Sequence, residues 1–215
     1  MGIYERRQRE KNSRIEAILD SAEKLISKEG FNSFTLSRLA KDLELSRGII
    51  YYYFKNEENI IAKLIADKMV LLFDILKSIP EDLNGYDSIK SVLEKFHGFL
   101  KKEVNYLNLI SYFTTCKLSK MDIKHIPYYQ EYEILRDKIF NVCLKSIEKG
   151  VADGSIDADV NPPVATYAIW AGVGSFWEFM LKDNVLREVK LPYLKRVDIF
   201  LQEYFRMIFK ALKCC

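Results

Sequence analysis

Residues 18–61 read ILDSAEKLISKEGFNSFTLSRLAKDLELSRGIIYYYFKNEENII. Apolar residues recur there at spacings of three and four, and they predict a helix that runs from about Ser13 to a stop at Gly30, a residue that commonly follows a helix end. Thr35 and Ser46 are residues of the kind that cap helix N-termini, and each stands before a short apolar repeat. The stretch therefore predicts three helices, of which the second and third are short and separated by a tight turn.

The rest of the chain predicts further helices, separated by polar segments. A fourth helix, long and apolar, begins after Asn56 and ends at Pro80, which opens a polar stretch that contains Gly85. Beyond it, helices are expected at about 88–103, 106–118, 128–149, 162–182 and 192–213. No run that alternates apolar and polar residues between tight turns predicts a strand. The expected fold class is all-α, with about nine helices.

Composition and motifs limit the class of protein. With 215 residues and 49% apolar content, the chain can bury a sizeable core. Charged residues occupy the start, where a signal peptide needs an apolar run, and no run of about 18 apolar residues predicts a membrane span. We therefore expect a soluble, cytoplasmic protein without a membrane partner. No Gly-rich phosphate loop, G-x-S-x-G or H-E-x-x-H motif is present, so we expect no enzyme and no catalytic residues.

Four cysteines bear on redox and metal chemistry: Cys116, Cys143, Cys214 and Cys215. They have neither a metal-ligand spacing nor the density of a disulfide framework, so we expect no metal site and no cofactor. The neighbouring pair Cys214 and Cys215 could sense redox state or bind a metal, and the simpler alternative is a frayed chain end.

The positive charge is concentrated in the first quarter of the chain. Residues 1–55 hold 11 basic and 8 acidic side chains, whereas residues 56–215 hold 22 of each, which leaves all of the net +3 in the first segment. Five of the basic residues precede the first apolar helix: Arg6, Arg7, Arg9, Lys11 and Arg14. They suit an arm that contacts phosphates, and a solvated helix start is the alternative.

Two short helices joined by a tight turn predict a helix-turn-helix, whose second helix enters the major groove of DNA. In that helix, Ile50 and Phe54 lie one turn apart and are expected to face the core. The outward face then carries Arg47, Gly48, Tyr51, Tyr52 and Lys55. Arginine can bond a guanine edge or a phosphate, and tyrosine hydroxyls can donate to phosphates. Thr35 and Ser46 would add hydroxyls and free backbone N–H groups at helix starts.

Residues 18–61 resemble the DNA-binding domain of the TetR family of bacterial and archaeal repressors. The resemblance covers about the first 65 residues and rests on A-x-x-L-I near Ala22, Gly30-Phe31, Thr35-Leu36, Leu39-Ala40, and S-x-G-x-x-Y-x-Y-F from Ser46 to Phe54. It implies a helix-turn-helix DNA-binding domain over residues 1–55 and a helical ligand-binding and dimerisation domain over 56–215. The fourth helix, over 56–79, would link the two.

The resemblance also assigns roles to the outward-facing residues. Phosphate contacts are implied for Thr35, Ser46, Tyr51 and Lys55, and contacts with bases or their flanking backbone for Arg47, Gly48 and Tyr52. Two residues depart from the pattern. Glu44 stands in the turn, where the family often has glycine, and Glu57 opens the fourth helix, where it often has lysine. Glu57 would face the phosphates with the wrong sign, although an acidic residue in a first turn suits the helix dipole.

For the second half of the chain, the resemblance implies a homodimer formed by the last two helices, which binds a palindromic double-stranded operator. Small residues on the helix from Pro162 would let a partner helix approach closely: Ala165, Ala168, Ala171, Gly172 and Ser175. The last helix adds an apolar stripe that includes Leu194, Val197, Leu201, Tyr204 and Phe205. Burial of both stripes inside one subunit is the alternative.

The resemblance further implies a repressor that a small hydrophobic or aromatic effector releases from its operator, with the fourth helix as a lever. Candidate ligand-binding residues are Phe96, Phe99, Tyr112, Phe113, His125, Tyr132 and Trp170. Such side chains suit an apolar ligand pocket, and burial in the core is the alternative for most of them. A helical adaptor that binds protein without DNA is the remaining alternative function, and it leaves the outward-facing tyrosines and arginine unexplained.

Overall fold

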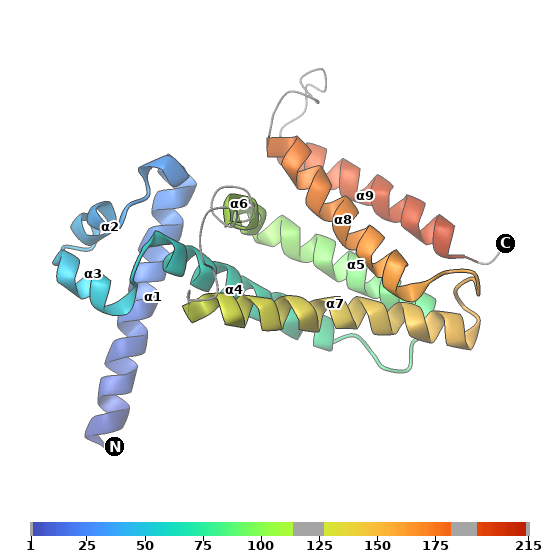
Figure 1. Ribbon diagram of the computed structural model, residues 1–215, viewed down its shortest axis with the longest axis horizontal. Helices are drawn as coiled ribbons and strands as arrows, with labels where there is room; N and C mark the ends of the chain where they lie inside the picture. Colours follow the sequence, from blue (N-terminus) through green and yellow to red (C-terminus); the bar gives the residue numbers. More distant parts are fainter. Residues whose placement is uncertain (1, 114–126, 182–192, 214–215) are drawn as a thin grey trace. The chain divides into compact units, whose positions relative to one another are not determined.

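The computed structural model describes residues 2–113, 127–181 and 193–213. The regular elements over these residues are α1 (Ile3–Glu29), η1 (Phe31–Ser33), α2 (Leu36–Asp42), α3 (Arg47–Tyr53), α4 (Glu57–Lys77), α5 (Gly85–Lys102), α6 (Val104–Tyr112), α7 (Pro127–Asp153), α8 (Pro162–Leu181) and α9 (Tyr193–Leu212) (Figure 1). All of them are helical. The predicted all-α fold class is confirmed for the described part of the chain.

The chain forms two compact units. Unit 1 consists of Met1–Asp67 and Tyr112–Tyr132, and unit 2 consists of Lys68–Ser111 and Glu133–Cys215. Both α4 and α7 contribute residues to each unit, as does α6 through its last residue. The predicted domains, 1–55 for DNA binding and 56–215 for ligand binding and dimerisation, are defined by function. The division into compact units does not test them, so they stay a prediction.

Three helix boundaries differ from the sequence prediction. Helix α1 begins at Ile3 rather than near Ser13, because its first turns consist of strong helix formers and include the ion pair Arg6–Glu10 at 2.9 Å. Helix α5 begins at Gly85, since the Asn84 side chain caps it by accepting from the Asp87 N–H at 2.8 Å. Helix α7 continues to Asp153 through a segment that was expected to be a loop.

The core of unit 1 is built by one face from each of α1 to α4. Its most deeply buried residues are at most 2% exposed and include Ile18, Ala22, Leu36, Leu39, Ile50, Phe54, Ile60 and Ile65. Aromatic rings from the 112–132 segment join this core. Tyr112 stacks on Phe31 with ring centroids 4.1 Å apart, and the Tyr128 ring lies 6.0 Å from that of Phe54. Unit 1 therefore includes residues distant in sequence from the helix-turn-helix.

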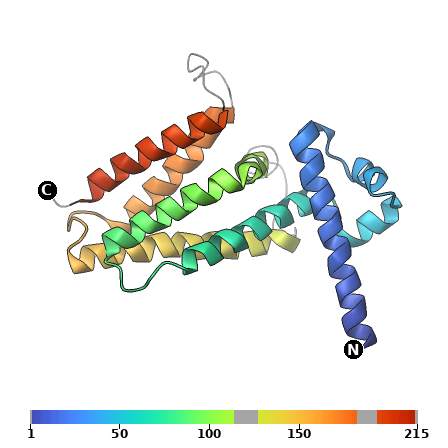
Figure 2. The same ribbon diagram turned by 180° about the vertical axis from the view of Figure 1, so that it is seen from behind.

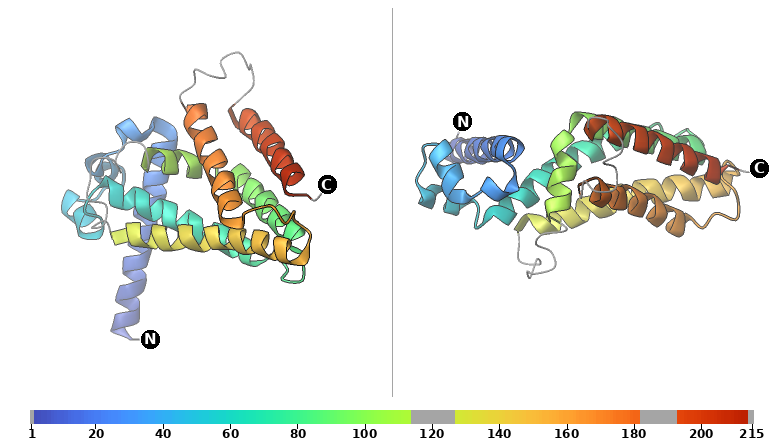
Figure 3. Two further views of the ribbon diagram at one scale, coloured as in Figure 1. Left: turned by 45° about the vertical axis from the view of Figure 1, so that its right-hand side comes forward. Right: turned by 90° about the horizontal axis from the view of Figure 1, so that it is seen from above.

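Unit 2 is a helical assembly in which α5 packs along α9 (Figure 2). Helices α8 and α9 lie side by side (Figure 3), where the Tyr204 hydroxyl donates to the Ala168 carbonyl at 2.8 Å. Between α5 and α9, Asp198 accepts from Lys101 and pairs with His97, each at 2.7 Å. The hydrogen bond from Lys101 holds the pKa of Asp198 below its ordinary value. Across the described ranges, we find no helix with the length and apolarity that a membrane span requires.

Candidate nucleic-acid interface

The turn between α2 and α3 is fixed by the C-terminal cap of α2. The Leu45 N–H donates to the Ala40 carbonyl at 2.8 Å, and the Glu44 N–H donates to the Lys41 carbonyl at 3.1 Å. These two bonds form a Schellman motif, which requires a left-handed residue just past the helix end. Glu44 fills that position with φ 54°. Glu44, which departs from the family pattern, is therefore a strained residue at the turn that sets the direction of α3.

Replacing Glu44 by glycine should stabilise unit 1 by about 0.5–1 kcal/mol. The left-handed conformation costs an L-residue roughly 1–2 kcal/mol, and the greater freedom of glycine in the unfolded chain offsets part of the gain. Urea denaturation followed by circular dichroism measures the change. The control Glu44→Gln removes the charge and keeps the strain, so it should bring no gain. Equal gains in both variants would contradict the backbone explanation.

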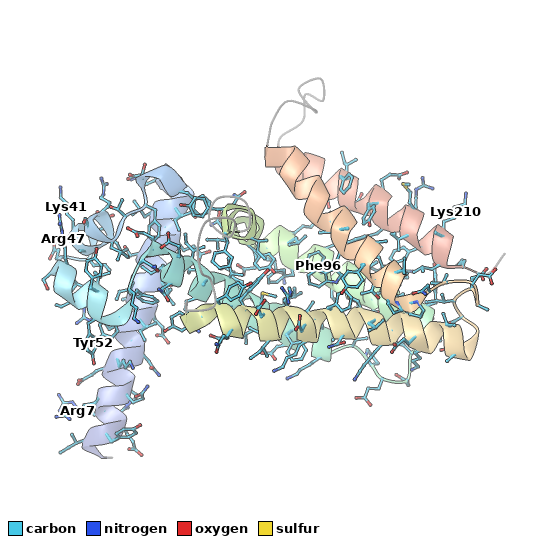
Figure 4. All side chains as sticks on the ribbon, in the orientation of Figure 1. Arg7, Lys41, Arg47, Tyr52, Phe96 and Lys210 are labelled. Carbon is cyan, nitrogen blue, oxygen red and sulfur yellow. The ribbon has the colours of Figure 1, made fainter. Side chains whose placement is uncertain are left out.

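Helix α3 presents one face to the core and one to solvent, as the sequence predicts. Ile50 is fully buried and Phe54 is 1% exposed, whereas Tyr51 is 55% and Tyr52 76% exposed. Arg47, Gly48 and Lys55 are exposed as well. Figure 4 labels Arg47, Tyr52 and Lys41 on the same side of unit 1. The structure therefore brings the predicted α3 residues onto one surface, while their contact with DNA stays a prediction.

Two residues on this surface were not singled out from the sequence. Ile49 on α3 is 39% exposed, although an apolar residue in a short helix is normally assigned to the core. Lys41, near the end of α2, is exposed on the neighbouring helix. The helical position of Ile49, one residue before the buried Ile50, was the available signal, since adjacent residues cannot share a narrow buried face.

The start of α2 differs from the expectation. The Thr35 hydroxyl accepts from the Arg38 N–H at 3.1 Å, and the Leu36 N–H donates to the Glu57 carboxylate at 3.0 Å. Glu57 thus caps α2 from α4, where its negative charge suits the helix dipole. It is a structural acceptor and does not stand free toward a phosphate. Because the Leu36 N–H is already bonded, it is also not a free anion donor.

Charge on the surface of unit 1 is unevenly neutralised. Arg38 pairs with Glu29 and Asp42, each at 3.2 Å. By contrast, none of the described acidic residues forms an ion pair with Lys41, Arg47 or Lys55. Ser46 begins α3 without a side-chain capping bond, and the nearest atom to a Cβ added at Gly48 is the Ser46 Oγ at 3.9 Å. The surface of α3 is therefore cationic and sterically open.

The candidate ligand-binding residues are divided between the two units. Tyr112, Phe113 and Tyr132 belong to unit 1, where the rings of Phe113 and Tyr132 lie 5.8 Å apart. Phe96, Phe99 and Trp170 belong to unit 2, in which Phe99 is buried and the other two are half-buried. His125 lies outside the described residues. The role of this set stays a prediction.

One candidate of unit 2, Trp170, lies near the Phe140 ring and the Cys143 thiol. Its ring lies 6.0 Å from that of Phe140, which is in turn 4.8 Å from the ring of Tyr167. Burial raises the pKa of the neighbouring Cys143 thiol to about 12, so this cysteine remains a neutral core group. Cys143 is therefore a buried thiol in the core of unit 2.

The predicted dimer helices combine internal packing with exposed apolar groups. Gly172 of α8 packs against the Tyr204 ring of α9 in the same chain, so part of the small-residue stripe serves contact within the subunit. Val164 and Tyr167 of α8 are nevertheless 64% and 66% exposed, and Met207 of α9 is 59% exposed. The predicted stripe residues Ser175, Leu194 and Val197 lie outside the described side chains.

Known proteins resemble this chain both in sequence and in fold. Residues 18–64 match the family model described as bacterial regulatory proteins, tetR family. The fatty acid metabolism regulator protein of Bacillus subtilis is 28% identical over 98 residues, which cover 45% of this chain and 50% of that protein. The negative transcriptional regulator IcaR of the Staphylococcus epidermidis biofilm operon icaADBC is 28% identical over 79 residues, covering 37% and 43%. The chain thus spans about half the length of the curated relatives that it matches.

Solved structures resemble the fold over nearly the whole chain. FadR from Bacillus subtilis in complex with stearoyl-CoA superposes with a TM-score of 0.64 at 18% identity, covering 92% of this chain and 98% of that one. A tetR-family regulatory protein from Rhodococcus RHA1 gives a TM-score of 0.68 at 15% identity, covering 94% and 97%. At these identities the likeness establishes the fold alone.

Proposed function

We propose that this member of the TetR family is a transcriptional regulator that binds a palindromic DNA operator as a homodimer, with α3 as the recognition helix. The observation that carries the proposal is the two-sided character of α3. Its buried face holds Ile50 in the core, and its exposed face offers Arg47 and Tyr52 to a ligand. A cationic helix that follows a tight turn suits the major groove.

Each exposed residue of this surface has a role that its chemistry supports. Arg47 and Tyr52 contact bases or their flanking backbone, and Gly48 lets the helix backbone approach the duplex. The phosphate contacts fall to Thr35, Ser46, Tyr51 and Lys55. Ile49 adds an apolar group that suits a thymine methyl.

The homodimer forms through α8 and α9, where the exposed Val164, Tyr167 and Met207 provide apolar area for a partner helix. A two-fold dimer places two recognition helices on equivalent half-sites, which accounts for a palindromic operator.

The proposed effector is a hydrophobic small molecule that binds the helical second half and releases the protein from DNA, so the protein acts as a repressor. A long-chain acyl thioester is the first candidate, because the names of similar proteins point to fatty acid metabolism and to bound stearoyl-CoA. Helix α4 is the proposed lever, since it contributes residues to both units. Release then follows from different effector affinities of two conformations.

The test of DNA binding is a selection from a library of randomised duplexes with the full-length chain, followed by titration of the best duplex at two salt concentrations. A salt-sensitive preference for a short palindrome supports the proposal. No preference over scrambled DNA, with folding verified by circular dichroism, would overturn it and favour the protein-binding adaptor.

Adding stearoyl-CoA to the complex with the selected duplex should weaken DNA affinity roughly 5- to 150-fold, the usual range of coupling between two sites. Fluorescence anisotropy of labelled duplex measures the change. Coenzyme A without the acyl chain is the matched control and should have little effect, because the proposed site takes an apolar ligand. Equal effects of the two compounds would contradict an apolar effector site.

A further inference from the structure

The first half of α1 is a helix without a core. Residues 2–14 are all exposed, and the first fully buried residue of α1 is Ile18. This segment projects beyond α2 and α3 within unit 1 (Figures 1 and 2). At 1.5 Å per residue, it extends α1 by roughly 20 Å. A helix segment of this length that packs on nothing is only marginally stable. This indicates that the segment serves to bind a partner.

Three of the five basic residues of this segment lie along one face. Arg7, Lys11 and Arg14 follow spacings of four and three, and the same stripe continues through Ile18, Ala22 and Leu25. In a helix this spacing places residues above one another. The face of α1 that packs on the helix-turn-helix in the second half of the helix is therefore cationic in the first half.

The acidic side chains nearby do not neutralise this stripe. Glu10 pairs with Arg6, and the Glu5 carboxylate accepts from the Gly2 N–H at 3.1 Å. Within residues 2–113, 127–181 and 193–213, Arg7, Lys11 and Arg14 have no ion-pair partner. Figure 4 places Arg7 on the same side of unit 1 as Arg47 and Tyr52. Arg7 thus lies on the side of unit 1 that carries the cationic surface of α3.

We propose that the first half of α1 is a second DNA contact, in which Arg7, Lys11 and Arg14 bind phosphates beside the half-site that α3 reads. The three positions span about 10 Å along the helix, on the order of three phosphates along one strand. This inference rests on the proposed function. It adds a binding surface outside the helix-turn-helix, and it predicts that base pairs next to the half-site contribute affinity through their backbone.

The experiment compares two double variants that remove the same charge from opposite faces of one helix. Arg7→Gln with Lys11→Gln removes two of the three stripe cations, and Arg6→Gln with Arg9→Gln removes two cations from the other face. Each variant is titrated against the duplex selected by the unmodified chain, once trimmed to the palindrome and once with about ten random base pairs on each side. Glutamine keeps helix propensity, and circular dichroism verifies it.

The stripe variant should bind the extended duplex roughly 10-fold more weakly, and the slope of log affinity against log salt should fall by about 2. On the trimmed duplex its deficit should shrink, and the Arg6/Arg9 variant should lose less on both. Equal losses for the two double variants would overturn the second contact while leaving α3 as the reader. If the unmodified chain selects no duplex at all, the proposed function and this inference fail together.

Discussion

Replacing both Arg47 and Tyr52 by alanine should remove the preference of the protein for its selected duplex while leaving the fold intact. A side chain that reads a base edge contributes about 1–3 kcal/mol, so losing two corresponds to an affinity decrease on the order of 30- to 20,000-fold. Neither residue supports the core: Arg47 is exposed and Tyr52 is 76% exposed. Anisotropy titration against selected and scrambled duplexes measures the preference, and urea denaturation checks stability.

A second substitution separates base reading from simple charge. Arg47→Lys keeps the positive charge but loses the planar fork that bonds a guanine edge at two points. It should therefore reduce the preference for the selected duplex and leave binding to scrambled DNA nearly unchanged. Arg136→Ala, which removes a half-buried arginine of unit 2 that pairs with Asp137 at 2.9 Å, is the control for general charge loss. If the preference survives both in Arg47→Lys and in the double alanine variant, Arg47 does not read bases.

The sequence predicted the helices that have a periodic apolar face or a capping residue at their start. Helices α2 and α3 begin where Thr35 and Ser46 predicted, and Ile50 and Phe54 occupy the core. The first half of α1 was missed for the same reason. Its helix has no core face, so an apolar period was absent, and only propensity and local ion pairs indicated it.

Features that depend on contacts between distant residues could not be predicted. The capping of α2 by Glu57 joins positions 21 residues apart. From the sequence pattern, only the charge of Glu57 and its position at the start of a helix could be predicted. The packing of Tyr112 on Phe31 and of Tyr128 beside Phe54 likewise joins residues that lie 81 and 74 positions apart in the sequence. Periodicity assigns a residue to a buried face, but the residue that covers that face is determined by the tertiary fold.

The contact between α5 and α7 is a feature of this kind, and it leads to the largest stability effect that we expect. A Cβ added at Gly85 would overlap the backbone of Gly150 and would lie 2.6 Å from the Ser146 carbonyl oxygen. Backbone atoms cannot rotate away as a side chain can. Gly85→Ala should therefore force the two helices apart and lower the free energy of unfolding by about 3 kcal/mol, the upper part of the usual range for overpacking.

Glycine at position 98 of the same helix supplies the matched control. A Cβ there meets nothing within 4 Å, so Gly98→Ala should raise the free energy of unfolding by about 0.5–1 kcal/mol through helix propensity alone. Gly150→Ala should fall between the two, because its Cβ meets the Ile156 side chain, whose Cγ1 would lie 2.6 Å away and can shift at some cost. Urea denaturation should rank the variants in that order. A Gly85→Ala protein as stable as Gly98→Ala would mean that α5 and α7 do not meet backbone to backbone.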